Sequence, residues 1–187
     1  MLISPSYQAQ QEKLHQTRNY GTTAEKYGAT ISEMVNMMGV KEVLDYGCGS
    51  LRSLMRTFKP DHECKVQCYD PGVPEYAELP KPAEMVVSID VLEHIEPEYI
   101  EDVLDHLEEL TQKVLFATVH LGPASKKLSD GRNAHLIQKP QEWWVPKFMD
   151  RFIMKGFNQR SAKGFEILCF PKDSDLAKDW GVVGRHF

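Results

Sequence analysis

The chain has 187 residues, of which 42% are hydrophobic and 26% are charged, and its formal net charge at pH 7 is −5. This length suits one globular domain around one core. The acidic balance disfavours the basic face on which nonspecific nucleic-acid binding depends. No apolar run approaches the roughly 20 residues that a membrane-spanning helix needs, and no secretory signal is evident. We therefore expect a single cytoplasmic domain without a membrane span.

The first 40 residues are mostly polar and helix-prone, and they end in an apolar stripe. Apolar side chains recur at helical spacing between residues 31 and 38. We expect residues 1–40 to form a helical lid with the first packed helix. Residues 41–170 are expected to form the core, and 171–187 a tail whose role the sequence does not reveal.

Short apolar runs in the core alternate with helical patterns. Residues 42–46, 65–69 and 84–89 each predict a buried strand, because each run is short and is followed by glycine or aspartate. From Glu98 on, apolar residues recur on one helical face, and residues 114–119 predict the next strand. This alternation favours a parallel sheet with right-handed crossovers.

The last third of the chain predicts a change in pattern. Residues 122–140 form a long polar segment, and loops of this length in compact domains are commonly functional. A helix is expected over 141–154. Two strand-like runs, 157–162 and 165–170, are separated by Lys163 and Gly164 and predict a C-terminal β-hairpin.

A glycine turn stands between the first strand and an expected helix that begins near Ser50. Its residues 45–49 read Asp-Tyr-Gly-Cys-Gly, and glycines let a backbone approach a ligand closely. Asp70 ends the next strand, where a carboxylate can accept hydrogen bonds from both ribose hydroxyls. Leu51 occupies the place where a dinucleotide site would bring a third glycine to a pyrophosphate. The pattern therefore favours a nucleoside site over a dinucleotide site.

These motifs, in this order, resemble those of the class I S-adenosylmethionine-dependent methyltransferases. V-L-D-Y-G-C-G-S is similar to their first motif, C-Y-D-P to their second, and residues 86–95 to the segment that closes their fourth strand. The resemblance spans about residues 31–170 and implies a Rossmann-like α/β fold that binds S-adenosylmethionine. The cofactor-binding residues it implies are Asp45, Gly47, Cys48, Gly49, Asp70, Pro71, Asp90 and Val91.

The chain departs from the family between its second and third predicted strands. The segment from Asp70 to Glu84 is proline-rich and too short for the helix, strand and loop that the family has there. In the family's strand numbering we therefore expect about six strands in the order 2-1-4-5-7-6, with the third edge strand reduced or missing. This loss also leaves the adenine pocket open to question.

A second resemblance concerns a metal. Some small-RNA 2′-O-methyltransferases and quinone-pathway O-methyltransferases carry an E-x-x-E-H motif that binds a divalent ion, and this chain has a similar D-x-x-E-H. The likeness implies that Asp90, Glu93, His94 and the more distant His135 are metal ligands. Such residues suit Mg²⁺, Mn²⁺ or Zn²⁺. The alternative is that Glu93 and His94 cap a helix and line a pocket without a metal.

The function that the resemblance implies is methyl transfer to an oxygen or nitrogen of a small molecule or nucleotide; a nucleic-acid acceptor is less favoured. His120 and His135 are the general-base candidates, because imidazole can accept a proton near neutral pH. The candidate substrate contacts are Arg132, Asn133 and Trp143. Two alternatives remain, a noncatalytic cofactor-binding module and an enzyme that uses S-adenosylmethionine for other chemistry. The oligomeric state is not indicated.

Overall fold

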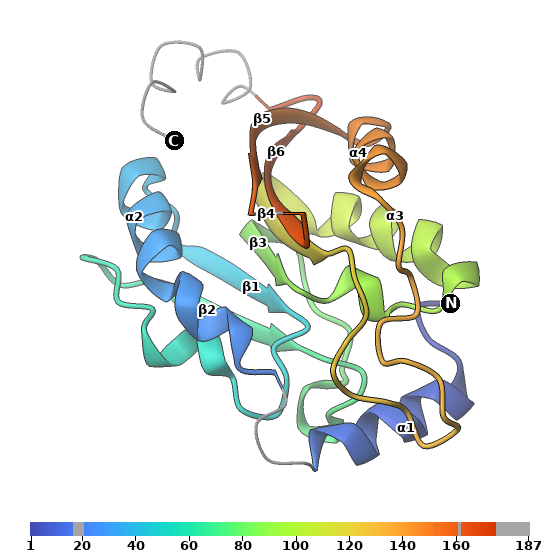
Figure 1. The fold of residues 1–187 in the computed structure, drawn as a ribbon. Coiled ribbons are helices and arrows are strands. Elements are labelled where there is room, and N and C mark those ends of the chain that lie inside the picture. The colour runs from blue at the N-terminus through green and yellow to red at the C-terminus, as the bar shows by residue number, and fades with distance from the viewer. Residues whose placement is uncertain (17–20, 161, 175–187) are drawn as a thin grey trace.

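The computed structural model describes residues 1–16, 21–160 and 162–174. A six-stranded sheet runs through the molecule in the order β2-β1-β3-β4-β6-β5 (Figure 1). Its strands are β1 (Glu42–Tyr46), β2 (Lys65–Tyr69), β3 (Ala83–Ile89), β4 (Thr111–His120), β5 (Phe152–Gln159) and β6 (Gly164–Pro171). The α-helices are α1 (Pro5–His15), α2 (Gly28–Met38), α3 (Ile100–Leu110) and α4 (Gln141–Met149). Most of the predicted C-terminal tail lies outside the described residues.

The strand order confirms the predicted topology. β2, β1, β3 and β4 are parallel to their neighbours, while β6 pairs antiparallel with both β4 and β5. In the family's numbering this is the expected order 2-1-4-5-7-6, with the C-terminal hairpin at one edge. The segment from residue 70 to residue 82 contains a short 3₁₀ turn, Pro74–Tyr76, and no strand. β2 is therefore an edge strand.

Alternate side chains of the strands pack against helices on opposite faces of the sheet. Leu44 and Leu115 belong to the buried cluster that includes α3 and α4, whereas Val43 and Phe116 belong to the cluster that includes α2. This two-residue alternation is what a pleated strand imposes on a sheet covered on both sides. The two cores together hold the carboxyl ends of the parallel strands in place.

The helix that we expected to begin near Ser50 is not an α-helix. Residues 50–52 are turns, and a single 3₁₀ turn follows over Ser53–Arg56. Gly49 and Arg52 both have left-handed backbones, with φ of 63° and 44°, and such residues interrupt a right-handed helix. In addition, the hydroxyl of Ser53 donates to the carbonyl of Gly21, 2.8 Å away. The glycine motif is thus followed by a tight loop.

One other boundary differs from the sequence prediction. Helix α4 ends at Met149, because residues from Phe152 onward pair with β6 rather than continuing the helix that we had extended to Met154. Tertiary strand pairing outweighs local helix propensity there. The segment after β3 forms the 3₁₀ turn Leu92–His94, and α3 begins at Ile100, close to the helix predicted from Glu98 on.

Helix α1 lies beyond the carboxyl ends of the parallel strands, as the predicted lid would (Figure 1). Ser4 begins it, and the amide and hydroxyl of Ser4 both donate to the carboxylate of Glu96, at 2.8 and 2.6 Å. The Tyr7 hydroxyl donates to the carbonyl of His94 at 2.5 Å. These bonds fasten the start of α1 to the segment after β3. Among the described residues, no helix has the length and apolar character to cross a membrane.

Candidate cofactor and acceptor site

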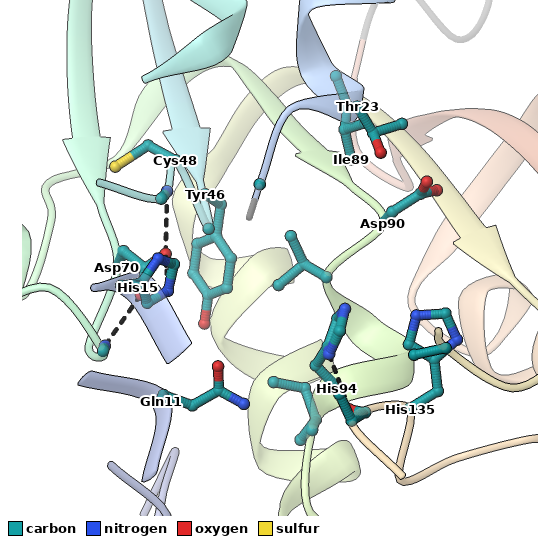
Figure 2. Close-up of a pocket in the computed structure, with 18 of the residues that line it drawn as sticks. Gln11, His15, Thr23, Tyr46, Cys48, Asp70, Ile89, Asp90, His94 and His135 are labelled. Atoms are coloured by element: carbon teal, nitrogen blue, oxygen red, sulfur yellow. Dashed lines mark hydrogen bonds and ion pairs between the residues drawn. The ribbon is translucent and has the colours of Figure 1, made fainter. Parts of the chain in front are cut away.

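A cavity of about 510 Å³ lies between α1 and the carboxyl ends of β1 to β4. Ligands of open α/β sheets bind at this edge, where the loops after adjacent strands separate. Figure 2 shows Gln11 of α1 on the side of this space opposite Tyr46, while His15 of α1 lies against Asp70. The cavity therefore has one wall from the sheet and one from the lid.

The glycine turn after β1 brings backbone to the cavity. Gly47 has φ of 83°, and a Cβ placed on it would lie 2.4 Å from a methyl group of Val91. Its amide donates to the carbonyl of Tyr69 at 2.7 Å. Only glycine can adopt this backbone and this spacing without strain. Cys48, Gly49, Pro71 and Val91 also line the cavity, as the sequence predicted for cofactor-binding residues.

Asp70 joins the loops after β1 and β2. Its Oδ2 accepts from the amide of Gly49 and its Oδ1 from the amide of Gly72, each at 2.9 Å. His15 Nε2 lies 3.5 Å from Oδ2. Burial raises the pKa of Asp70 and lowers that of His15. Asp70 thus lines the cavity, supports the glycine turn and contacts the lid.

Asp45 does not reach the cavity. This residue of β1 is 2% exposed, and burial, with smaller effects of Cys68 and Asp70, raises the pKa of its carboxyl group to about 8. Its Oδ2 has no hydrogen-bond partner in the part of the chain that the structure describes. The predicted direct contact of Asp45 with a cofactor therefore has no support in this geometry, because Asp45 is not among the residues that line the cavity.

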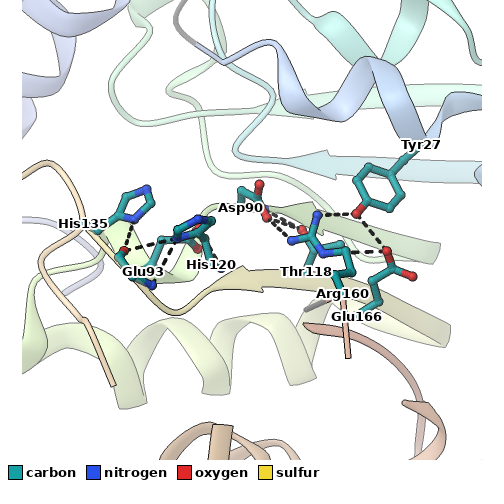
Figure 3. Close-up of polar contacts among 9 residues, drawn as sticks. Tyr27, Asp90, Glu93, Thr118, His120, His135, Arg160 and Glu166 are labelled. Carbon is teal, nitrogen blue, oxygen red and sulfur yellow. Dashed lines mark hydrogen bonds and ion pairs between the residues drawn. The ribbon is translucent and has the colours of Figure 1, made fainter. Parts of the chain in front are cut away.

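Asp90 belongs to a different cluster from the other predicted metal ligands. Its Oδ1 accepts from the Thr118 hydroxyl at 2.6 Å and from Arg160 Nη2 at 2.8 Å (Figure 3). Arg160 also donates to the hydroxyl of Tyr27. These bonds turn Asp90 toward β6 and away from Glu93. Sequence reasoning missed Arg160, since no motif marks an arginine that meets Asp90 only through the C-terminal hairpin.

Glu93, His94 and His135 do come together. One ligand atom of each lies within 4.8 Å of the others, and the two imidazole centroids are 4.6 Å apart. Nδ1 of His94 lies 2.8 Å from the carbonyl of Ala134, and Nδ1 of His135 lies 2.7 Å from that of Gly122. A carbonyl only accepts hydrogen bonds, so each Nδ1 carries the proton and each neutral ring has its lone pair on Nε2.

The same cluster is electrostatically unusual. Glu93 is fully buried, its Oε1 accepts from the amide of His120 at 2.9 Å, and its Oε2 has no partner among the described residues. Burial and the nearby Asp90 raise its pKa well above the ordinary range. Burial and His135 lower the pKa of His94 to about 4, and burial also lowers that of His135. At neutral pH the imidazoles are therefore uncharged and able to accept a proton or ligate a cation.

His120 joins this group at the cavity wall. It lines the cavity at the end of β4, and its ring centroid lies 5.0 Å from that of His135. Its Nδ1 lies 3.2 Å from the carbonyl of Gly122. Both predicted general bases, His120 and His135, are thus brought together on the side of the cavity opposite Asp70.

The three predicted substrate contacts do not line the cavity. Arg132 pairs with Asp130 at 2.8 Å on the surface, and Asn133 bonds both the amide and the carbonyl of Ala124 at 2.9 Å. Trp143 packs beside the buried Trp144, and Lys147 lies over its ring. These residues hold the 122–140 loop and α4 in place. The loop instead presents Pro123, Ala124, Ser125, Lys126, Ala134 and His135 to the cavity.

No family model and no curated protein matches the chain in sequence, but many solved structures share its fold. The N1-methyltransferase of 1,6-didemethyltoxoflavin from Burkholderia thailandensis, solved with its substrate and S-adenosylhomocysteine, is 12% identical, with a TM-score of 0.54, over 81% of this chain and 80% of that one. The DhpI–S-adenosylhomocysteine complex is 14% identical, with a TM-score of 0.57, over 90% of this chain and 94% of that one.

TnmH is 12% identical, with a TM-score of 0.57, over 87% of this chain. The match covers 57% of TnmH, so this chain corresponds to little more than half of that protein. At such low identities the likeness concerns architecture. The strand order is that of the Rossmann-like class I methyltransferase fold without its third, edge strand.

Proposed function

We propose that this protein transfers a methyl group from S-adenosylmethionine to an oxygen or nitrogen of a small molecule or nucleotide. The observation that carries the proposal is the pairing of the Gly47–Gly49 turn with Asp70 at one end of a cavity in this fold. Structural neighbours crystallised with S-adenosylhomocysteine support the choice of cofactor. The chain itself supplies the binding surface and the groups that receive a proton.

The order of the strands predicts how the cofactor lies. Along the sheet edge, Asp70 follows β2, the glycine turn follows β1, Asp90 follows β3 and His120 ends β4. With the ribose hydroxyls on Asp70, the methionine portion passes the glycine turn toward Asp90. Cys48, Pro71 and Val91 would pack against it. His15 would lie over the ribose and exclude water from that end.

The acceptor end is then formed by His120 and His135. The sulfonium of the cofactor already supplies a reactive methyl group, so the protein mainly has to align donor and acceptor and to remove a proton where the acceptor carries one. Nε2 of His135 can take that proton, because its Nδ1 is directed to the carbonyl of Gly122. His120 is the second candidate base, and its Nδ1 lies 3.2 Å from both the amide and the carbonyl of Gly122. Helix α1 covers the cavity, which favours a small acceptor over a polymer.

We further propose that Glu93, His94 and His135 hold a divalent cation at the acceptor end. Two imidazoles and one carboxylate suit Zn²⁺, Mn²⁺ or Fe²⁺. A cation would also give the buried Oε2 of Glu93 the partner that it lacks among the described residues. Such an ion would orient an acceptor hydroxyl and lower its pKa. Because it would occupy Nε2 of His135, the proton of the acceptor would then pass to His120. Asp90 is omitted from this set because Arg160 and Thr118 hold it elsewhere.

Metal binding can be tested without any acceptor. Zn²⁺ and Mn²⁺ should each be titrated calorimetrically into chelator-treated protein, and thermal unfolding followed with and without the ion. His135→Ala should abolish the binding and the thermal shift. His62→Ala is the matched control, since His62 lies beside the carbonyl of Val40, outside the cluster and the cavity. If the parent protein neither binds these ions nor gains thermal stability from them, the metal proposal is refuted, and Glu93 and His94 line the pocket without a metal.

The activity test begins with calorimetric titration of S-adenosylmethionine and S-adenosylhomocysteine. Protein with bound cofactor is then incubated with a panel of hydroxyl- and amine-bearing small molecules and nucleotides, and the nucleoside product is identified by mass. S-adenosylhomocysteine supports methyl transfer, whereas methylthioadenosine would identify aminocarboxypropyl transfer. Cofactor binding without turnover on any acceptor would favour the noncatalytic module. Failure to bind either nucleoside would overturn the proposal.

A further inference from the structure

Two cysteines lie together beside the glycine turn. Cys48 belongs to the turn and lines the cavity, whereas Cys68 belongs to β2 and does not line it. The amide of Cys48 donates to the carbonyl of Tyr69 at 3.2 Å, which places the turn next to the end of β2. Both thiols are free, and they share a hydrogen bond; Figure 2 shows the Cys48 sulfur on the side of β2. Only a small approach separates this pair from a disulfide.

Cys68 has the surroundings of a reactive thiol. It lies in the edge strand β2 and is partly exposed. The hydrogen bond from Cys48 and the guanidinium of Arg52 lower the pKa of the Cys68 thiol, although burial opposes them. Arg52 Cζ also lies 5.7 Å from the centre of the Tyr76 ring, which helps to hold the guanidinium there. These contacts favour the thiolate, which is the nucleophilic form of cysteine.

The other two cysteines lack this environment. Cys64 is also partly exposed, but burial and the carboxylates of Glu84 and Glu42 raise its pKa. Cys169 is fully buried in β6, and burial raises its pKa to about 12. Thiols with a raised pKa stay protonated at neutral pH and react slowly with oxidants. Cys68 is therefore the cysteine that an oxidant should modify first.

We propose that Cys48 and Cys68 form a reversible disulfide that weakens cofactor binding, with a peroxide as the oxidant. This regulation rests on the proposed function, because Cys48 belongs to the proposed cofactor-binding turn. The Cys68 thiolate attacks one oxygen of the peroxide, the O–O bond breaks, and the other oxygen leaves as hydroxide, which takes up a proton to give water. The Cys48 thiol then attacks the sulfenic sulfur of Cys68, and its proton leaves with the hydroxyl group as a second water. Two thiols are oxidised, one peroxide is reduced, and exchange with a dithiol reverses the change.

The disulfide would reshape the glycine turn. Pairing with β1 holds β2 in the sheet along its whole length, whereas the two glycines that flank Cys48 have left-handed backbones, with φ of 83° at Gly47 and 63° at Gly49. Glycines permit a change of backbone conformation at low cost, so the turn moves more than the strand does. The amide of Gly49, which donates to Asp70 Oδ2 at 2.9 Å, moves with it. The cofactor then loses part of the surface that the turn presents to the cavity.

The first test follows the disulfide itself and needs no cofactor. Reduced protein is treated with hydrogen peroxide, the remaining thiols are alkylated, and peptides from a digest without reduction are identified by mass. A peptide pair joined through Cys48 and Cys68 should be the main oxidised product, and dithiothreitol should restore both thiols. Oxidation of Cys68 to a sulfinic acid without this linked pair, or faster oxidation of Cys64, would overturn the proposal.

The second test measures the affinity for S-adenosylhomocysteine by calorimetry before and after oxidation. The oxidised parent should bind at least about tenfold more weakly than the reduced parent, and dithiothreitol should restore the affinity. Cys68→Ser, which alters a residue outside the cavity lining, should bind as the reduced parent does and should not respond to peroxide. Cys64→Ser is the matched control, since Cys64 is also partly exposed, and it should respond as the parent does.

The outcomes distinguish the regulation from the proposed function. If the disulfide forms and the oxidised parent keeps its affinity, the regulation is refuted and the proposed function stands. A Cys68→Ser protein that still loses affinity with peroxide would also refute the regulation. If Cys68→Ser does not fold, the comparison of oxidised with reduced parent decides alone. If the reduced parent does not bind S-adenosylhomocysteine, the proposed function fails and the regulation fails with it.

Discussion

Replacing Asp70 by alanine should weaken both cofactor binding and folding, for separable reasons. The carboxylate accepts hydrogen bonds from the amides of Gly49 and Gly72, at 2.9 Å each. A buried donor left without a partner costs about 1 to 3 kcal/mol. Water entering from the cavity would satisfy part of this need, and relief of the buried charge offsets more. We therefore expect the free energy of unfolding to fall by about 1 to 3 kcal/mol.

The loss of affinity comes from the ribose. Two hydroxyls that donate to a carboxylate would lose a charged acceptor, which is worth about 1 to 3 kcal/mol and weakens binding roughly 5- to 150-fold. Titration with S-adenosylhomocysteine measures this change, and urea unfolding measures stability. Asp70→Asn keeps one carbonyl oxygen and should give intermediate values for both.

A matched control separates the two effects. Ile31→Val truncates a fully buried side chain in the core around α2, away from the cavity. It should cost about 0.5 to 1.5 kcal/mol of stability and leave the affinity for S-adenosylhomocysteine unchanged. Parent-like affinity in a folded Asp70→Ala protein would refute the ribose assignment. A loss of affinity in Ile31→Val as large as that in Asp70→Ala would show that general destabilisation explains both.

Three other predictions concern the surroundings of the site. Burial raises the pKa of Asp45 to about 8 from an ordinary 3.8, so its contribution to the free energy of unfolding declines as pH rises between these values. The free energy of unfolding of Asp45→Asn should therefore depend less on pH from about 4 to 8 than that of the parent. An unchanged pH profile would contradict the raised pKa. Gly47→Ala should lose at least about 1 kcal/mol of stability, read from urea unfolding, since its Cβ would meet Val91 and its φ is 83°. Trp143→Ala should keep the parent affinity for S-adenosylhomocysteine, because Trp143 does not line the cavity. Trp144→Ala, at a fully buried position, should instead lose about 3 to 5 kcal/mol of stability in urea unfolding. Weakened binding in a folded Trp143→Ala protein would show that Trp143 belongs to the binding site after all.

Local sequence was sufficient where chemistry and geometry are set by neighbouring residues. β2 matches the predicted range 65–69, and the turn at Gly47 lies where two glycines follow a buried strand. Asp70 could be predicted because parallel strands bring their carboxyl ends to one edge, so a residue that ends β2 must face the turn after β1. The six-strand order followed from the resemblance to the class I methyltransferases, and the short segment between Asp70 and Glu84 accounts for the missing edge strand, since it leaves no length for it.

Tertiary structure decided what depends on contacts between distant segments. Arg160 reaches Asp90 only because β6 pairs with β4, and that contact removes Asp90 from the predicted metal ligands. His135 joins Glu93 and His94 only because the 122–140 loop folds back over the segment after β3. Asp45 is buried because β1 lies between β2 and β3 in the sheet, which neither its residue type nor its spacing reveals. Local patterns encode element type and periodicity, whereas these pairings depend on loop paths that the packing of the whole chain selects.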